Sequence, residues 1–131
     1  MKKLCILSVF FFLVFTMNSN AQVLVTTSSL TGVKLPVNTY RETNTTTLTK
    51  TLRKMDSLVF IYNIIIDKQY PELLYVNADS LFNVLKKYGF TVKNLNNSNL
   101  FEISKSTYRF MAYKNNTLSF SPSAICLARR K

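Results

Sequence analysis

The chain has 131 residues, with 17 lysines and arginines against 6 aspartates and glutamates and no histidine, and its formal net charge is +11. This length suits one domain with one core, and the positive charge favours anionic partners without indicating a fold. The absence of histidine excludes Ser-His-Asp and Cys-His catalysis. With only 2 cysteines and 2 glycines, the chain can form neither a zinc site of the usual kind nor a glycine-rich phosphate loop. We therefore expect no enzymatic activity, no cofactor and no bound metal.

Residues 1–21 have the three parts of a cleavable secretory signal peptide. Lys2 and Lys3 supply positive charge, and the apolar run Leu4–Phe15 follows. That run is shorter than the roughly 20 residues that a membrane-spanning helix needs. Small residues at positions 19 and 21 predict cleavage between Ala21 and Gln22. We therefore predict an exported protein, periplasmic or secreted, whose signal peptide contacts the membrane transiently; the alternatives are an uncleaved anchor or a buried core helix.

Residues 22–47 are rich in Thr, Ser and Asn and include Pro36. This composition is typical of loops. We predict an N-terminal arm or linker here, although a short strand over residues 22–26 also fits.

Residues 48–66 carry two conflicting patterns. Apolar side chains recur at helical spacing throughout. Residues 58–66, however, are apolar except for Asn63 and rich in β-branched residues, as in a strand buried on both faces. We favour a helix from about Thr46 to Ser57 followed by a strand to Ile66; the alternative is a single helix to Gln69.

A helix over Ala78–Tyr88 has the clearest signals. Asn77 or Asp79 can cap its start, two lysines occupy its last turn, and Gly89 suits the left-handed position that ends a helix. One face of this helix carries Ala78, Leu81, Phe82, Leu85 and Tyr88.

After Gly89 the apolar period changes to two, and Asn-rich segments separate the runs, as in hairpins. The predicted strands of this antiparallel meander are Phe90–Leu95, Leu100–Lys105, Thr107–Lys114 and Thr117–Ser121. The helix-facing side is predicted to carry Phe90, Val92, Phe101, Ile103, Phe110 and Ala112. The opposite side is predicted to carry Lys93, Leu95, Glu102, Arg109, Met111 and Tyr113.

The opposite side of the meander supplies a candidate binding surface. Basic residues alternate there with aromatic and thioether side chains, which can stack on ligands while the cations neutralise anionic groups. The candidate residues are Lys93, Arg109, Met111 and Tyr113. Because one-sided antiparallel sheets often have a mixed solvated face, an ordinary surface is the alternative interpretation.

The last ten residues, 122–131, are apolar and then basic. We predict a C-terminal tail, either a short helix over the sheet or a basic arm on a membrane surface. Cys126, the one cysteine after cleavage, is either a small buried hydrophobe or an intermolecular thiol. The predicted organisation is thus a signal peptide (1–21), an arm (22–47), an α+β domain (48–121) with a meander packed on one or two helices, and a basic tail.

The order of strand (73–76), helix (78–88), strand (90–95), hairpin and strand (100–104) resembles half of the short N-terminal domain of secretins and TonB-dependent receptors. This resemblance covers about a quarter of the chain and carries over no functional residue.

Three hypotheses of function follow. The leading one is an exported, non-catalytic interaction protein whose partner is an anionic envelope component or an acidic protein. Nucleic acid is not the expected partner, because no RNA-binding fingerprint is present. The alternative is a structural or accessory subunit that pairs with another chain through a sheet edge or Cys126. The third, implied by the resemblance, is a periplasmic signalling module.

Overall fold

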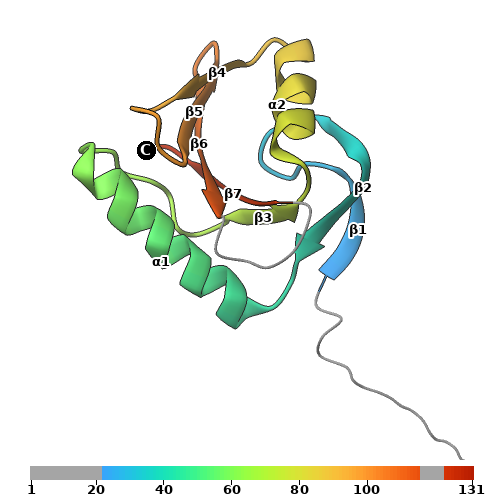
Figure 1. Ribbon diagram of the computed structural model, residues 1–131, viewed down its shortest axis with the longest axis horizontal. Coiled ribbons are helices and arrows are strands. Elements are labelled where there is room, and N and C mark those ends of the chain that lie inside the picture. The colour runs from blue at the N-terminus through green and yellow to red at the C-terminus, as the bar shows by residue number, and fades with distance from the viewer. Residues whose placement is uncertain (1–21, 116–122) are drawn as a thin grey trace, which may run out of the picture.

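The computed structural model describes residues 22–115 and 123–131. Within them, one seven-stranded antiparallel sheet has the order β1-β2-β3-β7-β6-β5-β4, and helices α1 and α2 lie on it (Figure 1). The α+β class predicted from the sequence is confirmed. The elements are β1 (Gln22–Thr27), β2 (Lys34–Glu42), α1 (Thr45–Ile61), β3 (Glu72–Tyr75), α2 (Ala78–Lys87), β4 (Thr91–Asn94), β5 (Leu100–Lys105), β6 (Tyr108–Asn115) and β7 (Ala124–Arg129). The predicted signal peptide and the predicted strand over 117–121 lie outside the described residues.

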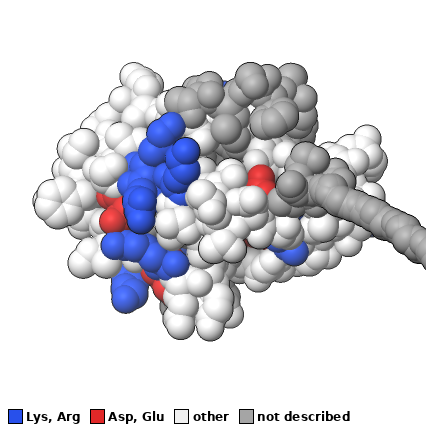
Figure 2. Space-filling model, turned by 90° about the horizontal axis from the view of Figure 1, so that it is seen from below, with Lys and Arg blue, Asp and Glu red and all other residues white. Residues whose placement is uncertain are grey.

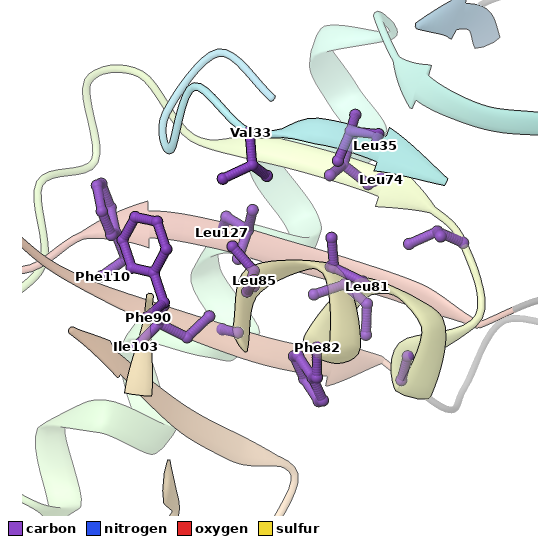
Figure 3. Close-up of a cluster of buried hydrophobic side chains, with 14 residues drawn as sticks. Val33, Leu35, Leu74, Leu81, Phe82, Leu85, Phe90, Ile103, Phe110 and Leu127 are labelled. Carbon is purple, nitrogen blue, oxygen red and sulfur yellow. The ribbon is translucent and has the colours of Figure 1, made fainter. Parts of the chain in front are cut away.

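Alternating side chains divide the core into two clusters, one on each face of the sheet. In β7, Ile125 and Leu127 join the cluster on the α2 side, whereas Cys126 and Ala128 join the cluster that packs against α1. Figure 3 shows the first cluster, in which the apolar face of α2 points at the sheet beside Val33 from the β1–β2 hairpin. The sheet is therefore covered by a helix on each side.

Helix α2 and the strands after it agree closely with the sequence prediction. Asn77 accepts a hydrogen bond from the Ser80 N–H at 3.0 Å, and Gly89 has a φ of 92°, so the cap and the terminator are where their residue types predict. All six side chains predicted to face the helix lie in or against the α2-side cluster. Tyr88 differs: it is exposed beyond the end of the helix.

Helix α1 corrects the prediction for residues 46–69. It runs from Thr45 to Ile61, so neither the strand predicted over residues 58–66 nor the single helix to Gln69 is present. The chain turns after the helix, where Asn63 has a φ of 59°. Beyond this turn Ile64 and Ile66 are buried. The apolar run therefore supplies buried side chains from the last turns of a helix and from a return segment, whereas Phe60, Ile61 and Ile65 within it are exposed.

Residues 22–47 do not form the expected arm. They supply β1, β2 and the start of α1, and the hairpin contributes Val33 and Leu35 to the core. Threonine and valine favour strands, and Pro36 is tolerated because β2 pairs with β3 only around Tyr40. The polar composition reflects an edge hairpin with one side in solvent.

The predicted C-terminal tail is also wrong. Residues 124–129 form β7, which lies between β3 and β6 near the middle of the sheet. The five residues Ala124–Ala128 are all buried, as expected for a strand covered on both faces. The basic residues that follow suggested an arm, but they mark the point where this central strand reaches the surface.

Candidate binding surface

The four residues predicted as a binding surface do not form one. Met111 and Tyr113 are buried in the cluster under α1, whereas Lys93 and Arg109 are exposed on β4 and at the start of β6. Burial raises the pKa of the Tyr113 hydroxyl, and the nearby Cys126 adds to the rise. The prediction failed because it assumed a one-sided sheet, and α1 covers the second side.

Cys126 lies in the middle of β7 and is fully buried. Burial raises the pKa of its thiol to about 12. A thiol in this position has no access to another chain while the sheet is intact, so the structure contradicts the interpretation of an intermolecular thiol. Cys126 packs as a small core residue.

Basic side chains gather instead at one end of the sheet. The strand register places the end of β5, the start of β6 and the end of β7 side by side, through the pairs Lys105–Tyr108 and Phe110–Arg129. Past β7, the Arg130 N–H donates to the Arg109 carbonyl oxygen at 3.0 Å. Three separate strands therefore bring cations to the same end.

This basic region continues onto α1. The Asp67 N–H donates to the Arg129 carbonyl oxygen at 2.7 Å, which places the following residue, Lys68, near the end of β7. Lys68 in turn forms an ion pair with Asp56 of α1 at 2.9 Å. Arg53, Asp56 and Lys68 line one small surface depression beside α1. Figure 2 shows Lys and Arg side chains gathered on the side seen from below Figure 1, where α1 runs. We define the basic surface as Arg53, Lys68, Arg109, Arg130 and Lys131. The Arg129 side chain, opposite Phe110 in the register, lies on the α2 face of the sheet instead.

The two buried carboxylates lie inside the fold rather than on this surface. Glu72 accepts hydrogen bonds from Ser28 Oγ at 2.7 Å and from the Ser29 N–H at 2.8 Å, and it pairs with Arg41 Nη2 at 2.9 Å. Glu42 accepts from the Tyr75 hydroxyl at 2.5 Å. Burial raises the pKa of the Tyr75 hydroxyl, and its hydrogen bond to Glu42 raises that pKa further.

The remaining acids offset the basic surface only in part. Glu102 pairs with Arg130, and Asp56 pairs with Lys68. Asp79 lies in the first turn of α2, where a negative charge suits the helix dipole. The acids near this end, Asp56, Asp67 and Glu102, are fewer than the cations of the basic surface, which therefore keeps a net positive charge.

A hollow of about 460 Å³ adjoins this end, between the β1–β2 loop and the start of β6. Lys105 lines this hollow. Its Nζ donates to the Tyr88 carbonyl oxygen at 2.6 Å and lies 5.4 Å from the centre of the Phe90 ring. Sequence reasoning missed this hollow, because no local pattern indicates that residues 29–33 fold against residues 88–110.

Among the described residues, no group of three or more Cys, Asp or Glu side chains could hold a metal ion, and no helix is long and apolar enough to cross a membrane. Comparisons with protein-family models, with curated proteins and with solved structures found no match. The class is therefore defined by fold and surface: an antiparallel α+β domain with a basic surface at one end of its sheet.

Proposed function

We propose that this is an exported, non-catalytic binding protein that holds an anionic partner through the basic surface. The observation that carries the proposal is the gathering of cations from α1, β6 and β7 at one end of the sheet, while two of the acids are buried. Charges of one sign on one surface attract polyanions over about a Debye length, roughly 8 Å at physiological ionic strength. The partner is an envelope component or an acidic protein.

The test uses the chain from Gln22 to Lys131 and heparin as a soluble polyanion. Two double variants remove equal charge: Arg109→Gln with Lys131→Gln on the basic surface, and Lys93→Gln with Lys114→Gln elsewhere on the sheet. At roughly 1 kcal/mol for each basic residue near an anionic surface, the first pair lowers heparin affinity about tenfold or more. The second pair changes it about twofold at most. The proposal is contradicted if the two double variants lose heparin affinity equally, or if heparin affinity does not change when salt is added.

A second candidate is subunit pairing through the outer edge of β1. Among the described residues this strand ends the sheet, and Val23 and Leu24 are exposed on it. An exposed edge with apolar side chains is a template for another strand. If this candidate holds, sedimentation detects a dimer that Leu24→Lys dissociates; a monomer at every concentration rejects it. The signalling-module hypothesis gains no observation of its own.

A further inference from the structure

Three large apolar side chains project into solvent where α1 ends. Phe60 is 78% exposed, Ile61 71% and Ile65 67%. We call these three residues the apolar tip. Figure 1 shows this end of α1 at the margin of the molecule, away from α2. Single exposed apolar residues are ordinary. Three of them within one six-residue segment form an apolar patch of the kind that marks an interaction site.

The apolar tip is held in place by buried neighbours. Val59, Ile64 and Ile66 alternate with the exposed residues and lie in the cluster under α1. The Ile64 N–H donates to the Val59 carbonyl oxygen at 3.1 Å, which closes the turn. The exposed side chains are therefore presented outward by an anchored turn, and moving them into the core would expel the buried ones.

Cations flank the apolar tip on two sides. Arg53 and Lys54 lie seven residues before Phe60 and Ile61, which is two helical turns, so each pair shares a face about 10 Å apart. On the other side, the Lys131 N–H donates to the Ile65 carbonyl oxygen at 2.9 Å. The tip therefore borders the basic surface directly.

The acids near the apolar tip do not reverse its positive surroundings. Asp56 is paired with Lys68 at 2.9 Å, so these two charges offset each other. Asp67 accepts from the Gln69 N–H at 2.9 Å and keeps its charge, but the cations beside the tip, Arg53, Lys54 and Lys131, outnumber it. An apolar projection flanked by cations matches an interface whose outer layer is anionic and whose next layer is hydrocarbon. That is the surface of a membrane containing acidic lipids. A soluble polyanion would match the cations but offer nothing to the three apolar side chains.

We infer that the apolar tip inserts into the headgroup region of an anionic membrane while the basic surface contacts the lipid phosphates. This inference rests on the proposed function, because it names a lipid surface as the anionic partner. Each fully buried aliphatic or aromatic side chain is worth about 1.5–3 kcal/mol, and each nearby cation adds about 1 kcal/mol. Both contributions are needed for stable attachment through a surface contact alone.

Co-sedimentation with vesicles of phosphatidylcholine, with or without an equal part of phosphatidylglycerol, tests the inference. The chain from Gln22 to Lys131 binds the mixed vesicles and not the neutral ones. Replacing the tip (Phe60→Ser, Ile61→Ser, Ile65→Ser) lowers vesicle binding about tenfold or more and leaves heparin binding unchanged. The control is Val37→Ser, which removes an exposed apolar side chain of the distant hairpin and leaves both activities intact. Thermal melting confirms that every variant folds.

Tryptophan fluorescence reports insertion directly, because the chain contains no tryptophan. Phe60→Trp shifts to shorter wavelength on mixed vesicles, and Val37→Trp does not. Heparin binding without binding to mixed vesicles overturns the inference and leaves the proposed function standing, whereas binding to neither overturns both. Vesicle binding that survives loss of the tip, with no shift for Phe60→Trp, also overturns it.

Discussion

Glu72 shows how one side chain fixes the position of a hairpin. It is buried on β3 and accepts hydrogen bonds from the β1–β2 loop, while Arg41 of β2 supplies the opposite charge. A buried carboxylate requires such partners, because desolvating an unpaired charge is costly. The loop is thereby held over the α2 side of the sheet, where it forms one wall of the hollow.

Glu72→Gln removes the charge that neutralises Arg41 and one oxygen acceptor for the loop. Breaking a buried pair destabilises by about 3–5 kcal/mol, and because Arg41 is partly exposed we expect the low end, about 3 kcal/mol, in urea unfolding. Asp56→Asn, which breaks the exposed pair with Lys68, is the control and costs less than about 1 kcal/mol. Similar losses in the two variants would show that burial of Glu72 is not what makes it important.

Cys126 gives a prediction about pH. Burial raises the pKa of its thiol from 9.0 to about 12, so the folded state holds the proton more tightly than the unfolded state does. The stability linked to this proton is complete below pH 9 and is lost as the pH rises toward 12. N-ethylmaleimide at pH 8 therefore labels the thiol only in denaturant.

The alkaline loss of stability in Cys126→Ala is smaller than in the wild type. It does not vanish, because the pKa values of Tyr75 and Tyr113 are raised in the same direction. Rapid labelling of the native protein would contradict the buried position of the thiol.

At the scale of elements, the two helices begin in the same way. Asn44 accepts from the Thr47 N–H and Asn77 from the Ser80 N–H, each at 3.0 Å. Asn44→Ala and Asn77→Ala should each lower the free energy of unfolding by about 1 kcal/mol, the usual value of an N-cap. Urea titration measures both, and replacement by Ser or Asp restores most of the loss. If Asn44→Ala has no effect, α1 is held by packing alone.

How well each element could be predicted depends on where its determining contacts lie. Helix α2 was predictable because its cap, apolar face and terminating glycine are all local. The end of α1 was not, since residues 58–66 fit a strand equally well until packing against β7 selects a helix. Strand β7 was missed because its partner β3 lies about fifty residues earlier, at Glu72–Tyr75.

The candidate surface illustrates the same limit. Lys93, Arg109, Met111 and Tyr113 were grouped by strand alternation alone, and α1 then buried two of them. The basic surface depends on register among strands that are distant in sequence, so composition could indicate an anionic partner but not where it binds. The apolar tip is exposed because α1 ends in a turn at this point. The strand expected over residues 58–66 would have buried these side chains, so the sequence did not predict the tip.

At the scale of the whole molecule, β7 joins two parts of the chain. Strands β1 to β3 lie on one side of it and β4 to β6 on the other, so the sheet is continuous only when the last segment is in place. Its five buried residues contribute to both core clusters. Because both halves bury apolar surface against this strand, we expect the two halves of the sheet to fold together.

Ending the chain at Ser123 should therefore abolish cooperative unfolding, because it removes the central strand and opens both clusters. Ending it at Arg129 keeps the strand and removes only the contacts of Arg130 and Lys131 with Arg109, Glu102 and the 65–66 segment. That chain should unfold cooperatively with a loss of about 1–2 kcal/mol. Circular dichroism during heating distinguishes the two chains. A cooperative transition in the chain ending at Ser123 would show that the two halves of the sheet fold independently and that β7 adds to a structure already formed.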